Sequence, residues 1–332
     1  MRLVVVGVII LAQLFFLALI IRQLKDNSVI LYFVLELLAV LAVLGLLDHN
    51  QNSSYRAVWL VIILVLPVFG YILYMLWGRA ATTGRKSVRT QETLRRTSQF
   101  LQQEPEVYAA LEQAHPGRKR MASFLIREGF PLYKNTFCRY FPLGELQFEQ
   151  MLKDLVKAER FIFLEYYILA EGKLWDRIYE VLKVKTRQGV EVRLLFDDFG
   201  SIITLPNDFI QQLKKEGIQA LAFNPVHRYI SRLYINYRNH QKIAIIDGNI
   251  GYTGGTNLAD EYANIYPKYG HWKDTAIRLE GDAVWSLTVT FLQMWETENR
   301  KQEDYCQYQP TVNIPGDGFY QPFSDGPVNN PH

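Results

Sequence analysis

The residues best suited to chemistry are His240 and Lys242, which stand two positions apart in the chain. The residues that follow, 243–246, are apolar and mostly β-branched, so the segment is predicted to be a buried strand. Side chains two positions apart on a strand share a face, so the imidazole and the ammonium group should point the same way. An imidazole can attack phosphorus as a nucleophile, and a neighbouring lysine can neutralise the charge that builds on phosphoryl oxygens.

A turn and a pair of glycines complete the pattern. Asp247-Gly248-Asn249 is predicted to end the strand, and residues 250–253 to form a return strand that leads into Gly254-Gly255-Thr256-Asn257. The two glycines would let backbone N–H groups approach a phosphate closely, and the amide of Asn257 can add a hydrogen bond. Asp247 lies an odd number of positions after His240, so its side chain should point to the opposite face of the strand. We therefore interpret Asp247 as holding the turn or a domain contact. A hairpin with an incidental histidine and lysine is the alternative, and for that pair alone it is the better interpretation.

The pattern H-x-K-x(4)-D followed by G-G-x-N resembles the signature of the phospholipase D superfamily. Within it, the chain is similar to bacterial cardiolipin synthases in residues 69–71, 78–79, 164–167, 197–201, 237–240 and 270–274. The resemblance implies a catalytic set of His240, Lys242, Asp247 and Asp274. It also implies phosphate binding by Lys242, Gly254, Gly255 and Asn257, with no metal and no cofactor.

Asp274 owes its assignment to this resemblance, which implies an acidic residue hydrogen-bonded to the nucleophilic imidazole. Such a carboxylate fixes the tautomer and leaves the other ring nitrogen free to attack. An ordinary carboxylate on a surface strand is the alternative.

Glu165 and Arg238 are further candidates. Glu165 lies within an apolar strand, where a carboxylate needs a partner, and either a buried salt bridge with a lysine or a place in the site would supply one. Arg238 can select an anionic head group or simply face solvent. Asp197 and Asp198 end a predicted strand, but no calcium-type loop of oxygen ligands accompanies them, so we expect no metal.

Three apolar runs, at about residues 3–21, 29–47 and 57–77, each have the length of a membrane-spanning helix. The first can also be a signal peptide, but no small-residue cleavage site follows it. Basic residues cluster after Trp77, so the positive-inside rule places the rest of the chain in the cytoplasm. This basic cluster can attract anionic lipid head groups or serve only as a topology signal.

The order of patterns predicts an α/β fold, with N-terminal transmembrane helices followed by one phospholipase D-type α/β sandwich half. We divide the chain into an anchor (1–80), a basic and polar connecting region (81–130), a catalytic half (131–308) and a linker-like tail (309–332). Strands at 160–169, 189–196 and 218–223 alternate with helices, which predicts a largely parallel sheet with helices on both faces. A further strand at 274–279 and a helix at 282–298 follow.

Composition narrows the class of partner. The net charge is only +3, which disfavours a nucleic-acid binder that depends on a broad basic surface. The two cysteines, Cys138 and Cys306, are far apart and have no metal-type spacing, so we expect free thiols.

We find no second copy of the complete motif, whereas enzymes of the family are expected to build one site from two copies. The expectation is therefore a truncated chain that needs a missing C-terminal half, with a homodimer as the alternative. The predicted reaction makes cardiolipin from two phosphatidylglycerol molecules, with release of glycerol and a phospho-histidine intermediate. A phospholipase D-type hydrolase, another phosphatidyltransferase and a non-catalytic membrane scaffold remain open, and a nuclease is disfavoured.

Overall fold

The structure is a computed structural model, and it describes residues 53–74, 85–225, 238–268, 270–316 and 318–325, with isolated positions between Phe15 and Val43. The chain forms two compact units. One consists mainly of residues up to Ala80, and the other begins at Ala81 and contains the predicted catalytic half.

The larger unit is built on one seven-stranded sheet with the order β1-β7-β6-β5-β2-β3-β4. The strands are β1 (Thr136–Phe141), β2 (Phe161–Tyr166), β3 (Glu191–Asp197), β4 (Gln219–Phe223), β5 (Lys242–Ile246), β6 (Ile250–Gly254) and β7 (Ala276–Gly281). Only β2, β3 and β4 pair in parallel, while β5 is antiparallel to β2 and every remaining pair is antiparallel. The expectation of a largely parallel sheet is therefore wrong, because the motif hairpin inserts beside β2 in the opposite direction.

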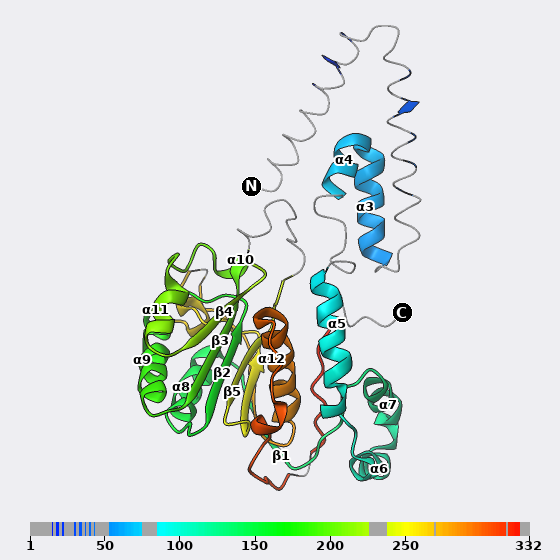
Figure 1. The fold of residues 1–332 in the computed structure, drawn as a ribbon. Coiled ribbons are helices and arrows are strands. Elements are labelled where there is room, and N and C mark those ends of the chain that lie inside the picture. The colour runs from blue at the N-terminus through cyan, green and yellow to red at the C-terminus, as the bar shows by residue number, and fades with distance from the viewer. Residues whose placement is uncertain are drawn as a thin grey trace. The chain divides into compact units, whose positions relative to one another are not determined.

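Helices cover both faces of this sheet, as predicted (Figure 1). The helices on one face are α8 (Gly144–Leu155), α9 (Lys173–Arg187) and α11 (Phe209–Lys215), and their apolar residues join one core cluster. Helix α12 (Val284–Asn299) packs on the other face with Phe163, Leu195 and Ile245. The short helix α10 (Asp198–Ser201) follows β3 directly. Single 3₁₀ turns occupy Ser98–Phe100, Pro116–Arg118, Asp260–Ala263 and Tyr305–Tyr308.

The basic segment after the third apolar run is a helix, α5 (Arg85–Thr97), that packs on α12. Lys86 pairs with Glu298, Arg96 pairs with Glu296, and the guanidinium of Arg89 donates to the carbonyl of Thr297 at 3.0 Å. Lys86 and Arg96 are thus neutralised within the protein, which favours the topology signal over lipid attraction for these two cations. Two short helices follow, α6 (Pro105–Ala114) and α7 (Lys119–Arg127).

The C-terminal residues also pack on this unit. Tyr320 and Tyr133 exchange two backbone hydrogen bonds of 2.8 and 3.0 Å, and Gln321 donates to the carbonyl of Phe130 at 2.8 Å. Residues up to 325 therefore lie against the body of the domain, although their composition is linker-like.

The smaller unit contains α3 (Ser53–Val65) and α4 (Pro67–Leu73). Gly70 lies so close to the backbone of Ile62 and Ile63 that a side chain would not fit, and the rings of Trp59 and Tyr74 meet edge to face at 5.5 Å. The apolar run 57–77 is thus interrupted before Pro67, a residue that cannot donate a helical hydrogen bond. Among the described residues, no helix combines the length and the apolar character needed to cross a bilayer. The runs 3–21 and 29–47 lie almost wholly outside the described residues.

Candidate active site

The motif residues converge at one end of the strands, where β2, β3 and β4 have their carboxyl ends, because β5 runs antiparallel to β2. We call this end of the sheet the reactive edge. The start of β5 therefore lies beside the carboxyl end of β2, where Lys242 pairs with Tyr166. The end of β6, at Gly254, and the start of β7, at Ala276, pair at the same edge. Ligands of α/β sheets bind at the carboxyl ends of the parallel strands, so this edge is the expected position for a site.

His240 and Lys242 share a face, as predicted, and differ in burial. The His240 side chain is exposed, whereas Lys242 is only 6% exposed. The ammonium group of Lys242 donates to the carbonyl of His240 at 2.7 Å. The ring of Tyr167 lies 4.7 Å from the ring of His240 and 5.3 Å from the Lys242 ammonium. Tyr167 was not identified as a site residue from the sequence, although it follows the apolar run of β2 directly.

The surroundings lower the pKa of both groups. Loss of hydration lowers the pKa of His240 below its usual 6.5, and the charge of Lys242 adds to the effect. Burial lowers the pKa of Lys242 to about 8, against the opposing attraction of Asp274 and Asp197. At neutral pH the imidazole is therefore mostly neutral while the lysine is mostly charged. This is the combination that a nitrogen nucleophile beside a phosphoryl-binding cation requires.

Asp274 lies at this edge but does not contact the imidazole as we expected. Its carboxylate accepts the N–H of Thr275 at 3.0 Å and faces Gly255, and its charge acts on Lys242. The structure has no hydrogen bond between Asp274 and His240, because the side chain turns toward its own strand and toward Gly255.

The two glycines are required by packing. A side chain at Gly254 would overlap the carbonyl of Thr275, and one at Gly255 would overlap the carboxylate of Asp274. The N–H of Gly255 already donates to Thr275 at 2.9 Å. Phosphate binding by the Gly255 N–H would require this hydrogen bond to be exchanged and stays a prediction, while the missing side chain of Gly255 makes room for the Asp274 carboxylate.

Asn257 is also committed to the fold. It is 3% exposed, and its side-chain oxygen accepts the N–H of Ile168 at 2.9 Å. Its amide is hydrogen-bonded to Tyr262. Asn257 thus joins the loop after β6 to the segment after β2, and the predicted amide contact with phosphate would require it to leave these partners.

Asp247 lies at the far end of β5 and holds the turn, as we interpreted it. Its carboxylate accepts three backbone N–H groups, from Glu159 at 2.9 Å, Arg160 at 2.7 Å and Phe161 at 2.9 Å. Its own backbone has a positive φ of 56°, which aspartate tolerates better than most residues. Asp247 therefore fixes the start of β2 and takes no part at the edge where His240 lies.

Asp197 and Arg238 form a buried pair behind His240. Asp197 is fully buried and accepts the N–H of Asn239 at 2.9 Å, and the guanidinium of Arg238 lies 3.3 Å from its other oxygen. Arg238 also donates to the carbonyl of Asn224 at 3.2 Å. Arg238 is thus held by the protein and does not face a head group. The described residues contain no cluster of carboxylate, histidine and cysteine side chains that could hold a metal ion.

Glu165 has an amide partner, and the buried salt bridge with a lysine, one of the two alternatives, is not present among the described residues. Its carboxyl accepts a hydrogen bond from the side chain of Asn239, the residue before His240. Burial raises the pKa of Glu165 to about 8, against the opposing effect of that hydrogen bond. Asn239 was not identified as a site residue from the sequence. Its side chain donates to Glu165, and its backbone N–H donates to Asp197.

The sequence contains one more H-x-K triplet, His271-Trp272-Lys273, which differs from the motif. Arg278 stands where the motif aspartate would be, and the triplet lies in a loop before β7. The His271 side chain is 63% exposed and lies 3.4 Å from Glu145. It supplies no second copy of the motif.

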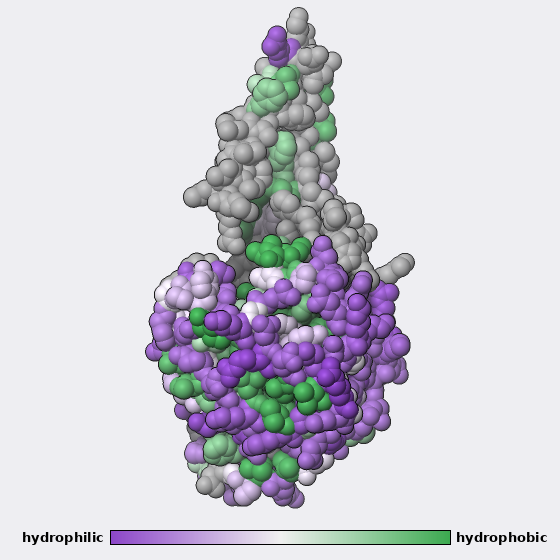
Figure 2. Space-filling view, turned by 90° about the vertical axis from the view of Figure 1, so that its left-hand side faces the viewer, coloured by the Kyte–Doolittle hydropathy of each residue, from purple (hydrophilic) through white to green (hydrophobic). Residues whose placement is uncertain are grey.

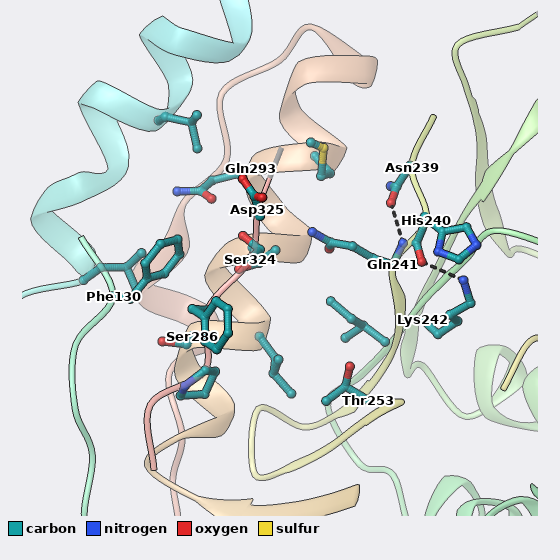
Figure 3. A pocket seen from close by; sticks show the side chains of 18 of the residues that line it. Phe130, Asn239, His240, Gln241, Lys242, Thr253, Ser286, Gln293, Ser324 and Asp325 are labelled. Carbon is teal, nitrogen blue, oxygen red and sulfur yellow. Dashed lines mark hydrogen bonds between the residues drawn. The ribbon is translucent and has the colours of Figure 1, made fainter. Parts of the chain in front are cut away.

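A cavity of about 600 Å³ lies behind the strand that carries the motif. Figure 3 shows Gln241, Thr253, Ser286 and Gln293 around it, with the side chains of His240 and Lys242 directed away from it. Gln241 has the opposite parity to His240 and Lys242, so the cavity opens on the α12 face of the sheet. The reactive groups therefore do not line this cavity with their side chains.

Two family models match the chain. Residues 151–267 match a model described as cardiolipin synthase, phospholipase D-like domain, and residues 37–79 match one described as phospholipase D-nuclease N-terminal.

Relatives match over most of this chain. An uncharacterized protein of Streptococcus mutans is 40% identical over 87% of this chain and 63% of its own length. A protein of Oceanobacillus iheyensis named cardiolipin synthase is 34% identical over 86% of this chain and 60% of its own length. The chain thus spans about 60% of the length of these relatives.

Solved structures are less similar. A phosphatidylserine synthase of Haemophilus influenzae aligns with a TM-score of 0.41 and 12% identity, over 58% of this chain and 45% of that one. A likeness of this size supports no argument about function. Residues 151–267 thus match a cardiolipin synthase-type phospholipase D-like domain, and the chain is similar to bacterial cardiolipin synthases over most of its length.

Proposed function

We propose that this chain is the membrane-anchored, nucleophile-bearing half of a phosphatidyltransferase that makes cardiolipin from two molecules of phosphatidylglycerol. The observation that carries the proposal is the pairing of an exposed His240, with its pKa lowered, and a buried Lys242 that stays mostly charged. Relatives named cardiolipin synthase support the choice of substrate.

In the proposed first step, a ring nitrogen of His240 attacks the phosphorus of phosphatidylglycerol. The bond between phosphorus and the glycerol oxygen breaks, and glycerol leaves after its oxygen gains a proton. In the second step, the hydroxyl of another phosphatidylglycerol gives up its proton and attacks the phosphatidyl-histidine. The phosphorus–nitrogen bond then breaks, which restores the neutral imidazole and gives cardiolipin.

Lys242 stabilises the phosphoryl oxygens in both steps, since its charge lies on the same side of the strand as the imidazole. Asp274 supports this role, because its negative charge raises the pKa of Lys242 and so opposes the lowering that burial causes. On substrate binding, a rotation of the Asp274 side chain would bring it to the imidazole, where it would fix the tautomer.

The proton donor for glycerol and the proton acceptor for the second alcohol are assigned to a second motif. We propose that this motif comes from a C-terminal half, because relatives are longer than the chain, with a second copy of the chain as the alternative source. The substrates are bilayer lipids, so an N-terminal anchor with the catalytic unit on the cytoplasmic side fits the reaction.

The test is a product assay on the chain purified in detergent. Phosphatidylglycerol is added with and without a separately expressed C-terminal half from the Oceanobacillus relative, and the lipids are read by mass spectrometry. We expect cardiolipin and glycerol from the unaltered chain with the added half, and neither from His240→Ala. Lys215→Ala, which changes a lysine on α11, serves as the matched control.

Other products would decide between the alternatives. Phosphatidic acid in place of cardiolipin would indicate a hydrolase, in which water accepts the phosphatidyl group. Equal product from His240→Ala and the unaltered chain would overturn the proposal.

A further inference from the structure

Three large apolar side chains stand exposed on a short segment after β3. Phe199 is 42% exposed, Ile202 is 51% exposed and Ile203 is 92% exposed. We call residues 199–203 the α10 segment. Figure 2 looks at the face that carries α9 and shows hydrophobic side chains at the upper end of the body, the end where Figure 1 labels α10. Scattered apolar residues are normal on a protein surface, but three of this size within five residues call for an explanation.

The α10 segment is in direct contact with the candidate active site. Gly200 packs so tightly on the carbonyl and ring of Tyr167 that a side chain there would overlap them. The hydroxyl of Ser201 accepts the N–H of Leu169 at 3.0 Å. The ring of Tyr167 in turn lies 4.7 Å from the ring of His240. A single aromatic ring therefore separates the backbone of the segment from the imidazole.

One buried carboxylate fixes both the segment and the strand that bears His240. Asp197 accepts the N–H groups of Phe199 and Gly200 at 3.0 and 3.1 Å. The same carboxylate accepts the N–H of Asn239. The guanidinium of Arg238 also lies 5.2 Å from the centre of the Phe199 ring. The backbone at the start of the segment and the backbone just before His240 are thus held by the same carboxylate.

We propose that the α10 segment inserts into the surface of an anionic phospholipid bilayer beside the active site. This inference rests on the proposed function, because it concerns how a bilayer lipid reaches His240. A lipid must present its phosphate to the imidazole while its acyl chains stay in an apolar environment. An apolar surface that is continuous with the site meets this need, and the ammonium group of Lys242 lies 5.3 Å from the same Tyr167 ring on which the segment packs.

The insertion can be tested without turnover, by measuring depth in the bilayer. The full chain, with Cys306→Ser, carries Ile203→Cys labelled with a thiol-reactive fluorophore and is reconstituted into phosphatidylglycerol and phosphatidylcholine vesicles. Val184→Cys is the matched control, since Val184 is 48% exposed near the end of α9, at the opposite edge of the sheet. Cys138, whose pKa is raised by burial, is checked for background labelling in Cys306→Ser alone.

Nitroxide-bearing lipids should quench the label at position 203 several-fold more than the label at 184, and the excess should grow with the phosphatidylglycerol content. Equal quenching at the two positions would overturn the proposal. A label at 203 that is shielded from water but not quenched by the lipids would also overturn it, because another protein surface would then cover the segment.

A kinetic comparison separates this inference from the proposed function. In the active assembly, Ile203→Glu should raise the KM for phosphatidylglycerol in vesicles by about tenfold and leave kcat unchanged. The KM for a water-soluble short-chain phosphatidylglycerol should not change. An equal rise of KM for both substrates would contradict bilayer insertion. If His240→Ala kept its activity while the quenching difference persisted, the proposed function would fail and the insertion would stand.

Discussion

The two ends of strand β5 differ in what their side chains contact. At its start, His240 is exposed, and the described residues offer its imidazole no hydrogen bond, only the ring of Tyr167. Just past its end, the carboxylate of Asp247 accepts three hydrogen bonds from backbone N–H groups at the start of β2. Both residues belong to one motif and are separated by a single short strand.

This contrast divides the motif into a part that is free to react and a part that holds the scaffold. A residue that binds substrate must keep hydrogen-bonding capacity unused in the resting protein, and His240 does so. Asp247 already uses that capacity for hydrogen bonds within the fold. Lys242 lies between the two extremes, because it is buried and bonded to a carbonyl yet remains at the reactive edge. Substitutions at the two ends should therefore affect different measured quantities.

The largest effect on rate, apart from loss of His240, is expected from Lys242→Met. Removing one preorganised cation from the phosphoryl group should lower kcat by about 10²- to 10³-fold. The free energy of unfolding should change little, because methionine fills similar space and no buried carboxylate loses a hydrogen bond. Steady-state kinetics and urea unfolding measure the two quantities, with Lys214→Met as a surface control. A loss of stability as large as the loss of rate would place Lys242 in the scaffold.

Asp247→Ala should show the opposite pattern. Loss of three charge-assisted hydrogen bonds should lower the free energy of unfolding by about 2–4 kcal/mol. Below the unfolding transition, kcat per folded molecule should stay close to that of the unaltered chain. Asp176→Ala, which removes an exposed carboxylate on α9, is the control. A large fall in kcat in a fully folded variant would contradict the division of the motif.

The pH dependence should report the reactive end alone. The imidazole must be neutral to attack, so the rate should rise with pH through the pKa of His240, which lies below 6.5. Lys242 must be charged, so the rate should fall as pH passes its pKa of about 8. Lys242→Arg keeps its charge at high pH and should remove the alkaline fall from the residual activity. An unchanged alkaline limb in this variant would show that another group titrates there.

The smallest expected effect on the rate concerns Glu165, which supports the reactive end from behind and should act mainly on stability. Its folded pKa of about 8 lies above the usual 4.5, so the folded state binds a proton that the unfolded state releases between these values. Stability should therefore fall as pH rises from about 4.5 to about 8. Glu165→Gln, which keeps an acceptor for Asn239, should make Tm less dependent on pH in this range. Glu149→Gln is the exposed control, and equal pH slopes in Glu165→Gln and the unaltered chain would contradict this reading.

Much of the fold was predictable because periodic patterns decide it locally. The strands β2 to β7 and the helix α12 begin and end within a few residues of their predicted positions, and helices lie between the strands as expected. Strand β1 was missed as a strand, because it is short, lies at an edge of the sheet and shows no regular alternation of buried and exposed side chains. The position of β5 beside β2 depends on contacts far apart in the sequence, which is why the sheet was wrongly expected to be largely parallel.

The site was predictable in residue type but not in orientation. The shared face of His240 and Lys242 follows from strand geometry alone. Whether Gly255 approaches a phosphate or a carboxylate depends on where Asp274 lies, and no local pattern shows this. The same limit applies to Arg238, whose partner Asp197 comes from a different strand. Tyr167 was not singled out as a site residue from the sequence, and only the fold brings its ring to His240.

The most direct test of the central claim is to trap the covalent intermediate. The full chain, combined with the separately expressed C-terminal half, is mixed with phosphatidylglycerol, quenched in alkali to preserve a phosphorus–nitrogen bond, and analysed by intact-protein and peptide mass spectrometry. We predict a phosphatidyl adduct on the peptide containing His240, formed together with free glycerol and absent from His240→Ala. An adduct on another residue, or transfer of the phosphatidyl group by His240→Ala at the normal rate, would contradict the account.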